Sequence, residues 1–527
     1  MAWNENKDKE LVMSAVNIRQ KKGQTTGALD FRGFMDDLDK KGELLRVPFE
    51  VDTLDDMGAF IARADYKGID TPILFEKPKG FDIPVLANSV GLTSKRMAAA
   101  HGVEADANML PNVAAKMMGI LKSGGVAPVY VDSSEAPCKE VIMKGDDVDL
   151  SILPVLRLNP EDGKGSPNFL EGRFISSLAL SKPKENAYNL SYHRFEITRK
   201  DGGSIWIFRG TGDAKSMEEF WGNKIDDPEP ADGREKGKAF PVAFVFGVTP
   251  EFMLAGANKA LPHESNDFAY IGGLRNEPVK LVKCETIDVD VPADAEIIVE
   301  GVMKPFNWTV QGAFASFNGF YDRPRKRPVF DVTAITMRKN PIYQHVHIGM
   351  PLNECNAIAS YFRGVHVYQD LKAVLPNVVD VHCEPAAGVG FTIHIAMKKG
   401  RVGEPKVAMM RAYTALQGFC KHVFVFDDDI DIREPLERDW ALAHRFIPDR
   451  DLMVIPNVLG MSLEPLAQGV MGSNSKLGVH DGHPTLPLNV RAFMGVDCTK
   501  PLGVKMMDRV GLVDQVERRV DKLWSKL

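Results

Sequence analysis

The short segment NLSYHR places Asn189 and Arg194 five positions apart, and both residue types suit an anionic ligand. A guanidinium presents a planar fork of donors that matches a carboxylate, and it stays charged at any working pH. On a straight strand, positions five apart point to opposite faces. We therefore expect Asn189 to lie in a loop before the strand, or the strand to bulge between Asn189 and Arg194.

A second informative stretch runs from Pro241 to Phe320. Val242–Val248 is a nearly continuous apolar run, which favours a strand buried on both faces. A further strand is expected at Ile297–Val302, and it leads into a loop rich in Gly and Ala, VQGAFASFNGFY. This loop carries Gln311 and Ser316, neither of which titrates near neutral pH.

This arrangement resembles the UbiD family of reversible decarboxylases. The family's usual loop reads E-G-P-F-G-E followed by G-Y, whereas here Gln311 and Ser316 stand where both glutamates belong, and Gly319 and Phe320 follow. The resemblance extends over nearly the whole chain. It includes DFRGFMDDLDKKGELLRV and PILFEKPKGFDIPVLANSVG near the start, then VFDDDIDIRE, Trp440, PDRD and the loop Ser475–Asp481 near the end.

The resemblance implies prenylated FMN as the cofactor, which forms an adduct with the substrate and accepts electrons as carbon dioxide leaves. It implies that Arg194 faces the substrate carboxylate. The cofactor contacts that it implies are Asn189, Ser191, Arg194, Arg209, Ala257, Asn258, Lys259 and Lys476. A flavin prenyltransferase would supply the cofactor, and a homo-oligomer, dimer or hexamer, is typical of the family.

The family's metal site is altered in this chain. Its histidine should follow a tryptophan by three positions, but Trp206 is followed there by Arg209, and the glutamate position holds Asp267. Asn189 and Asp267 still suit K⁺ or Mg²⁺, which accept oxygen ligands, whereas Mn²⁺ or Fe²⁺ has lost its imidazole. Alternatively, Arg209 meets the cofactor phosphate and replaces the metal's charge, or Arg209 is a surface residue.

The expected reaction is decarboxylation of an aromatic acid, and the missing glutamates leave its proton donor open. Water, Asp267 and His193 remain alternatives. A substrate with its own electron-withdrawing group and many negative charges would tolerate the loss of two carboxylates. An aryl-carboxylate coenzyme A thioester, such as phthaloyl-CoA giving benzoyl-CoA, fits this description. The basic cluster Arg323, Arg325, Lys326 and Arg327 follows the loop and could meet coenzyme A phosphates.

Two other functions compete with this interpretation. A non-catalytic UbiD-like subunit of a carboxylase complex would also have lost its acids, although such a subunit has less reason to keep Arg194 and Lys476. A flavin-dependent reductase rests on fold analogy alone. The sequence contains no Rossmann glycine fingerprint, P-loop or nucleophile elbow.

Two further groups of polar residues have competing interpretations. His345 and His347 in YQHVH share one strand face, and a polar strand face is favoured over a metal site or a substrate contact. Asp427–Asp431 resembles a metal cluster, but it follows a buried strand. We expect that acidic run to be structural.

Composition excludes several classes of protein. The 527 residues carry 65 basic and 71 acidic side chains, and the net charge of −6 gives no electrostatic case for nucleic acid or an anionic membrane. The six cysteines form no C-x-x-C pair, which is typical of reduced cytosolic thiols. A polar N-terminus and the lack of a long apolar run predict a cytoplasmic protein without a membrane span.

The elements predict an α/β, α+β multidomain fold. We expect an N-terminal α/β domain (1–125), a central split β-barrel that holds the cofactor (126–328), a C-terminal α/β domain (329–505) and a terminal helix (506–527). The strands predicted for the barrel are Ser177–Ser181, Asn189–Thr198, Ser204–Phe208, Val242–Val248 and Ile297–Val302. Further on, strand Phe391–Met397, helix Glu404–Gly418 and strand His422–Phe426 predict a β-α-β unit. The apolar seam Val513, Val516, Val520, Leu523 and Leu527 predicts a helix for packing or a subunit contact.

Overall fold

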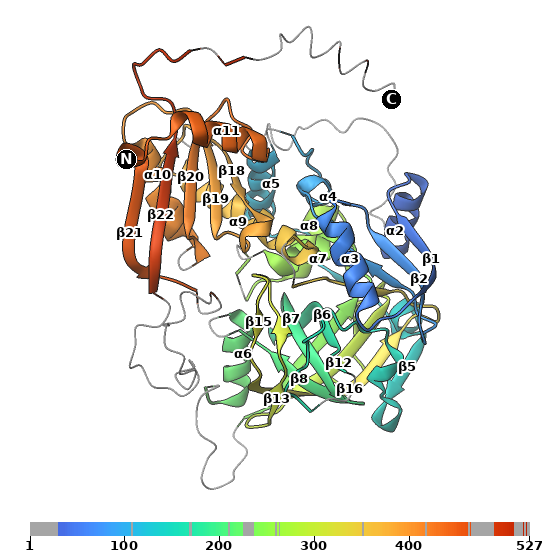
Figure 1. Ribbon diagram of the computed structural model, residues 1–527. Helices are drawn as coiled ribbons and strands as arrows, with labels where there is room; N and C mark the ends of the chain where they lie inside the picture. The colour runs from blue at the N-terminus through green and yellow to red at the C-terminus, as the bar shows by residue number, and fades with distance from the viewer. Residues whose placement is uncertain are drawn as a thin grey trace.

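Three layered parts make up the molecule: an N-terminal α/β unit, a central barrel and a C-terminal α/β unit (Figure 1). The structure, a computed structural model, describes residues 30–523 except 107–108, 168–170, 209–210, 225–236, 259–260, 263, 350–351, 417–418, 462–463, 465–489, 508, 511–519 and 521–522. The predicted mixed α/β class is confirmed.

The N-terminal unit is a four-stranded sheet of order β1-β2-β3-β17 with helices beside it. Its elements are α2 (Phe31–Lys40), β1 (Leu45–Val51), α3 (Asp56–Tyr66), β2 (Ile73–Pro78), β3 (Val85–Ala87), α4 (Ser94–Ala100), α5 (Met109–Ser123) and the later strand β17 (Tyr343–His345). Arg32 of α2 pairs through two nitrogens with the buried Glu296, both at 2.9 Å, and so fixes this unit to the barrel. Gly124 and Gly125 follow α5 with positive φ and end the helix.

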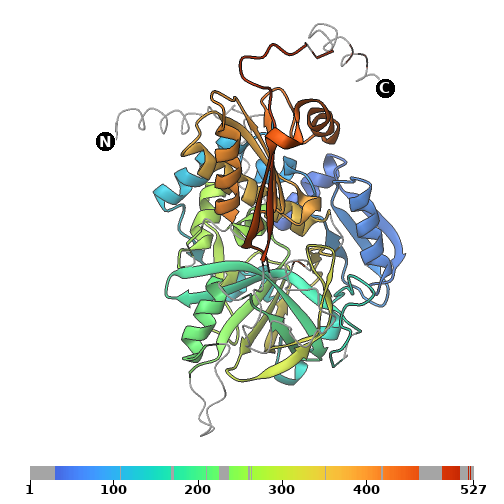
Figure 2. The same ribbon diagram turned by 60° about the vertical axis from the view of Figure 1, so that its left-hand side comes forward.

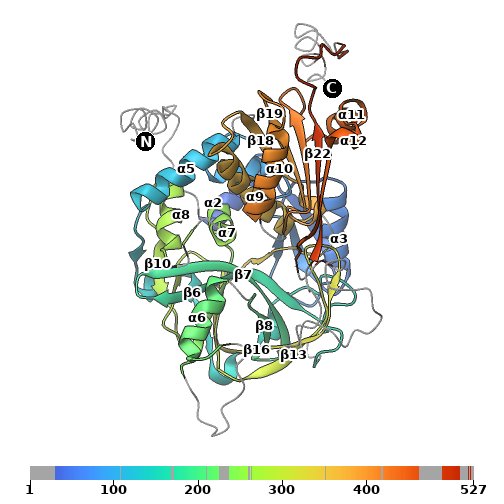
Figure 3. The same cartoon turned by 90° about the vertical axis from the view of Figure 1, so that its left-hand side faces the viewer.

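Six strands close the central barrel in the order β12-β9-β6-β7-β8-β16, because β16 pairs again with β12. They are β6 (Phe174–Lys184), β7 (Ala187–Arg199), β8 (Gly202–Trp206), β9 (Phe240–Phe246), β12 (Ile297–Met303) and β16 (Arg325–Met337). Phenylalanines fill the interior, among them Phe195, Phe244 and Phe330. Each of the five strand segments predicted from the sequence matches one of these strands, although the predicted ends at Phe208 and Val248 lie two residues beyond β8 and β9. Helix α6 (Gly212–Trp221) contacts β6 and β9 (Figure 3).

Smaller elements surround the barrel. They are β4 (Val129–Tyr130), β5 (Val141–Lys144), α7 (Pro250–Ala257), α8 (Asp267–Arg275), β10 (Lys280–Lys283), β11 (Asp290–Pro292), β13 (Trp308–Gln311), β14 (Phe314–Ala315) and β15 (Tyr321–Asp322). Short 3-10 helices span Ser133–Glu135, Pro137–Lys139, Gly145–Asp147, Leu150–Ile152 and Pro385–Ala387.

The barrel continues beyond residue 328, where the sequence placed a domain boundary. Strand β16 runs unbroken to Met337, since β13 pairs with its first half and β5 and β12 pair with its second half. The chain then returns to the N-terminal sheet as β17 before it enters the C-terminal unit.

The C-terminal unit is a five-stranded sheet of order β18-β19-β20-β22-β21 (Figure 2). Its elements are α9 (Glu354–Lys372), β18 (Val378–Cys383), β19 (Thr392–Met397), α10 (Glu404–Leu416), β20 (His422–Asp427), α11 (Pro435–Arg445), α12 (Pro448–Asp451), β21 (Leu452–Leu459) and β22 (Val490–Cys498). Parallel pairing of β19 with β20 confirms the predicted β-α-β unit. Of the predicted terminal seam, only Val520 and Leu523 lie within the described residues.

The acidic run after β20 is part of the C-terminal fold, as predicted. Arg445 lies 2.9 Å from Asp427 and 2.8 Å from Asp429, and Lys500 lies 2.6 Å from Asp429. Arg445 and Lys500 therefore neutralise Asp427 and Asp429. These ion pairs link α11 and the segment after β22 to the end of β20.

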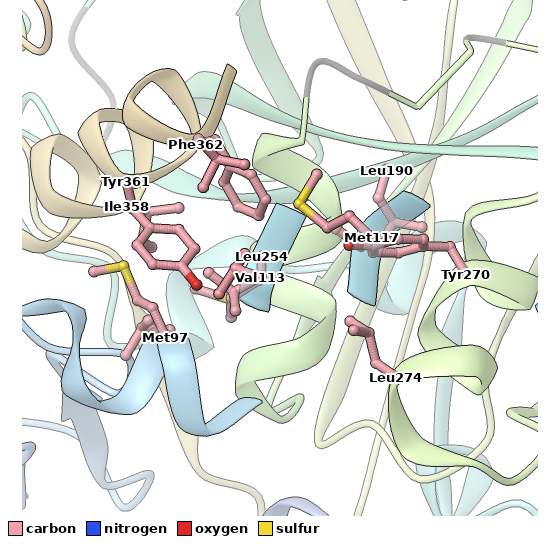
Figure 4. Packing of buried hydrophobic residues seen from close by; sticks show 14 of the residues in the cluster. Met97, Val113, Met117, Leu190, Leu254, Tyr270, Leu274, Ile358, Tyr361 and Phe362 are labelled. Carbon is pink, nitrogen blue, oxygen red and sulfur yellow. The ribbon is translucent and has the colours of Figure 1, made fainter. Parts of the chain in front are cut away.

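Helices from all three parts meet in one apolar junction (Figure 4). Side chains of α4, α5, α7, α8 and α9 pack together there, and Leu190 of β7 joins them from the barrel. No helix among the described residues is long and apolar enough to cross a membrane. All six cysteines are free thiols.

The junction allows a matched stability test, because adjacent methionines of α5 differ in burial. Met117 is 2% exposed in the junction, whereas Met118 is 43% exposed. We expect Met117→Ala to lower the free energy of unfolding by about 2–5 kcal/mol. Met118→Ala should change it by less than about 0.5 kcal/mol. Chemical denaturation of both variants measures this difference, and equal losses would contradict the packing described here.

Candidate active site

Strand β7 presents two polar faces. Its pairing with β6 is regular from Phe174↔Glu196 to Ser181↔Asn189, so Asn189 lies within the strand and no bulge separates it from Arg194. The prediction of a loop or a bulge was therefore wrong. Alternation places Asn189, Ser191 and His193 on one face and Arg194 on the other.

The Arg194 face holds a buried cation between aromatic rings. The guanidinium lies 3.9 Å from the ring centre of Trp206 and 4.5 Å from that of Phe314. Its Nε donates to Gln311 Oε1 at 2.9 Å, and its Nη2 lies 2.9 Å from Asp322 Oδ2. Burial lowers the pKa of Arg194, and the Asp322 carboxylate opposes that shift.

Gln311 and Ser316 lie on the loop that covers Arg194, and both are buried. The Gln311 amide also donates to the Ser204 carbonyl at 3.1 Å, so it bridges Arg194 and β8. The Ser316 backbone N–H donates to Phe320 O at 2.9 Å and closes the β14–β15 hairpin. This brings together Arg194 and Gln311, two of the residues predicted to be catalytic.

The same loop contacts the C-terminal unit. Asn356 at the start of α9 donates to the Phe317 carbonyl at 2.8 Å, and the Phe317 ring packs against Phe391 and Phe419. The loop that carries Ser316 is thus held between the barrel and the C-terminal unit.

Two buried acids lie beside this loop. Asp162 Oδ1 accepts from Ala315 N at 2.8 Å, and Glu196 accepts from Gly312 N at 2.7 Å. Burial raises the pKa of Asp162 to about 7, although hydrogen bonds from Ala315 and Asn159 and the charge of Arg194 oppose the rise. Burial also raises the pKa of Glu196. Asp162 therefore carries a proton at the lower end of the physiological range.

The opposite face of β7 forms a separate network around Asp213 of α6. Its carboxylate accepts from Ser181 at 2.6 Å, Asn189 at 3.0 Å, Ser191 at 2.5 Å and His193 Nε2 at 2.9 Å. Burial alone would raise the pKa of Asp213, but His193 and the serine hydroxyls lower it to about 2. His193 is thus on the strand face opposite Arg194.

Helices α7 and α8 both pack against β7 (Figure 3). Ala257 ends α7, and Asn258 after it is buried. Asp267, the first residue of α8, is buried and accepts from Leu190 N at 2.7 Å. Arg209, Lys259 and Lys476 lie outside the described residues. Within the described part of the chain, no cluster of three His, Cys, Asp or Glu side chains has the geometry of a metal site.

The basic cluster after the loop has two exposed members and two half-buried members. Arg323 and Lys326 are exposed, whereas Arg325 and Arg327 are half-buried. Arg327 lies 5.0 Å from the ring centre of Trp206, on which Arg194 also stacks. His345 and His347 are both buried, so the polar face that they form is not exposed to solvent.

Sequence reasoning missed three acids: Asp162, Asp213 and Asp322. Asp322 follows the loop motif directly, in GFYD, and that proximity was a usable signal. Asp162 in NPEDG reads as an ordinary turn residue, and Asp213 reads as the start of a helix. Their contacts with β7 and its covering loop are long-range, so no local pattern marks them.

Known proteins share the three-part organisation of this chain. Residues 35–112, 129–351 and 356–480 match the N-terminal, Rift-related and C-terminal domains of 3-octaprenyl-4-hydroxybenzoate carboxy-lyase, UbiD. The chain belongs to the UbiD family. It is thus a carboxy-lyase by family, and the expected resemblance is confirmed.

Individual UbiD relatives align along nearly the full length. An uncharacterised protein of Archaeoglobus fulgidus is 30% identical over 522 residues, which cover 94% of this chain and 98% of that protein. The UbiD-class enzyme HmfF from Pelotomaculum thermopropionicum, solved with FMN, is 28% identical with a TM-score of 0.79, covering 94% of this chain and all of HmfF. An evolved dimeric form of HmfF with prFMN is 27% identical with a TM-score of 0.74, covering 92% of this chain and 100% of that one.

The raised pKa of Asp162 predicts a pH dependence of stability. The folded protein keeps this proton up to about pH 7, whereas the unfolded chain loses it near pH 4. The unfolded state therefore binds fewer protons in this window, and the free energy of unfolding falls as the pH rises through it. We expect Asp162→Asn to remove a slope of up to about 1.4 kcal/mol per pH unit.

Denaturation midpoints between pH 4 and 8 measure this slope. Asp65 and Glu354 are buried acids whose pKa values burial also raises to about 7, so the effect is read as a difference from the wild type. The exposed Asp146→Asn variant is the control. An unchanged slope in Asp162→Asn would show that Asp162 keeps an ordinary pKa.

Proposed function

We propose that this UbiD protein removes carbon dioxide from an aromatic carboxylic acid with prenylated FMN as its cofactor. The observation that carries the proposal is the buried guanidinium of Arg194, stacked between Trp206 and Phe314 and adjacent to Asp162. A fixed cation between aromatic faces suits the carboxylate of a flat aromatic acid.

Arg194 and Asn258 are the described residues that we propose to contact the flavin, and the Leu190–Asp267 hydrogen bond holds α8 against β7. Asn189 and Ser191, which the family resemblance also implies, lie on the Asp213 face of β7, where both donate to Asp213. Arg209, Lys259 and Lys476 are the further cofactor contacts that the resemblance implies, and Arg209 is the alternative partner of the cofactor phosphate. Asn189 and Asp267 remain the proposed ligands of K⁺ or a divalent cation. When bound, prenylated FMN supplies an electron sink for the carbon–carbon bond that breaks.

Arg194 has the role of binding and orienting the carboxylate. It already pairs with Asp322, so an incoming carboxylate shares the guanidinium or displaces that side chain. Water is excluded because Arg194, Gln311 and Ser316 are buried, and ion pairing is stronger in such a site than in water.

Asp162 is our proposed proton source after carbon dioxide leaves. Gln311 and Ser316 cannot act as acids, and His193 lies on the other face of β7 in the Asp213 network. Asp162 is a buried carboxyl group with a pKa near 7, hydrogen-bonded to the residue before Ser316. A general acid is most effective when its pKa lies near the working pH.

A coenzyme A thioester of an aryl carboxylic acid, phthaloyl-CoA for example, is the proposed substrate. Its electron-withdrawing thioester would assist loss of carbon dioxide from a site that lacks the family's glutamates. The cations Arg323 and Lys326 are exposed next to the site and provide favourable charge for coenzyme A phosphates. A flavin prenyltransferase is the proposed supplier of the cofactor, and the active form is proposed to be a homo-oligomer.

The replacement of both glutamates also supports an alternative, a non-catalytic subunit of an aromatic carboxylase complex. The two functions differ in cofactor content and turnover. Protein co-produced with a flavin prenyltransferase should contain a flavin and release carbon dioxide by itself if the first proposal holds. A protein without flavin and without turnover would favour the subunit.

Arg194→Ala should lower the rate of carbon dioxide release by roughly one and a half to four decades. Removing one partner of a buried guanidinium–carboxylate pair costs about 2–5 kcal/mol, and each 1.4 kcal/mol is about tenfold in rate. The control is Arg199→Ala, because Arg199 is a partly exposed arginine of the same strand that pairs with Asp201 and Asp331.

Carbon dioxide release and solvent deuterium incorporation from phthaloyl-CoA and free aromatic acids measure the effect. Flavin absorbance and the thermal midpoint check that each variant is folded and loaded. A folded, loaded Arg194→Ala variant with normal turnover would refute the proposed role. Turnover of free acids but not thioesters would refute only the substrate.

Replacing Gln311 and Ser316 by the family's glutamates should not increase the turnover rate. In Gln311→Glu a carboxylate replaces the amide that donates to the Ser204 carbonyl, so two acceptors face each other. The double variant Gln311→Glu/Ser316→Glu also adds negative charge beside Asp162 and Asp322. We expect turnover of the thioester to fall and its KM to rise, as measured by steady-state kinetics. A gain in turnover would show that the site still depends on the lost acids.

A further inference from the structure

His345 and His347 are completely buried imidazoles whose polar atoms have no partner in the described chain. Each residue is 1% exposed. None of their four ring nitrogens makes a hydrogen bond to any described residue. Their ring centres lie 6.0 Å apart at an angle of 66°.

Buried ring nitrogens without a hydrogen-bond partner indicate a binding site for a ligand. Most buried polar side-chain atoms in proteins are hydrogen-bonded, since an unpaired one loses its bonds to water without compensation. Four such atoms on two neighbouring side chains would destabilise the protein for no benefit unless another molecule pairs with them. Residues kept at such a cost are characteristic of binding sites.

The residues that follow the pair lead to the loop that covers Arg194. Strand β17 contacts β6 and β9, and Ser176 of β6 is paired directly with Arg194. Gly349, two residues after His347, lies so close to Asn159 that a β-carbon there would be 2.7 Å from its amide nitrogen. Asn159 donates in turn to Asp162, which holds the Ser316 loop.

The state of the two rings decides which group they bind. Burial lowers the pKa of His345, and it lowers the pKa of His347 to about 4, so both are neutral at physiological pH. A neutral imidazole has one donor and one acceptor nitrogen. Two such rings suit an uncharged oxygen. They suit a second carboxylate poorly, because they bring no positive charge into a dry site. No third metal ligand accompanies them among the described residues.

We propose that His345 and His347 together bind an uncharged oxygen substituent of the substrate's aromatic ring while Arg194 binds the reacting carboxylate. The inference deepens the proposed function and rests on it. The oxygen is a thioester carbonyl, which accepts from two imidazole N–H groups, or a ring hydroxyl, which donates to one ring and accepts from the other. Both have the same uncharged hydrogen-bonding chemistry.

The test measures binding of four probes by calorimetry to protein loaded with its flavin. Benzoate has the carboxylate alone. Monomethyl phthalate adds an ortho ester carbonyl, salicylate adds an ortho hydroxyl and phthalate adds a second carboxylate. We expect one of two probes, the ester or the hydroxyl compound, to bind at least about tenfold more tightly than benzoate, because it carries the substituent that the histidines recognise. Phthalate should bind no more tightly than benzoate.

The variants His345→Phe and His347→Phe keep a flat ring but remove its nitrogens. Each variant should bind the preferred probe about two- to tenfold more weakly than the wild type does. Its affinity for benzoate should stay within about twofold of the wild-type value. His366→Phe is the control, because His366 is an exposed histidine of α9. The thermal midpoint of the ligand-free variants should stay the same or rise, whereas histidines with a structural role would make it fall.

The outcomes separate this inference from the proposed function. Equal affinity of the wild type for benzoate, the ester and the hydroxyl probe overturns the inference, as does tighter binding of phthalate. An equal loss of affinity for benzoate and for the preferred probe in the phenylalanine variants also overturns the inference. Unchanged carbon dioxide release in Arg194→Ala would instead overturn the proposed function, and the ring-substituent preference of His345 and His347 would survive that result.

Discussion

A guanidinium buried away from water destabilises the fold unless an anion pairs with it, and Arg194 imposes this requirement on the centre of the molecule. Asp322 meets it from the β14–β15 hairpin, and Gln311 fixes the orientation of the guanidinium from β13. The stacking rings of Trp206 and Phe314 then exclude water from the pair. The hairpin, the end of β13 and the end of β8 are therefore held in place by one cation.

Much of this arrangement was predictable from the sequence, because apolar runs and alternation mark strands such as β9 and β7. The loop motif likewise located Gln311 and Ser316 near Arg194. The position of Asp322 directly after the loop motif was a signal, but its pairing with Arg194 depends on the closure of a barrel whose strands are far apart in the chain. Asn189 was misplaced for a similar reason. A bulge seemed necessary to bring it to Arg194, but Asp213 gives it a partner on its own face.

Strand β7 separates two polar systems within one barrel wall. Around Asp213, four donors surround one carboxylate, and the network is closed within the protein. Around Arg194, one cation meets Asp322, and burial raises the pKa of Asp162 beside the covering loop. A closed network stabilises the fold, whereas an open one leaves room for a ligand. The contrast supports our proposal that the chemistry takes place on the Arg194 face.

The apolar junction has a consequence for how the chain folds during synthesis. It joins Val90 in the N-terminal unit to Phe493 in the C-terminal sheet, so its contacts span most of the chain. Such contacts form slowly, because long loops must close before they bring any gain in energy. Until the ribosome has made α9, the apolar sides of α4, α5 and α7 lack part of their cover. We therefore expect nascent chains of this protein to expose aggregation-prone apolar surface until α9 is complete.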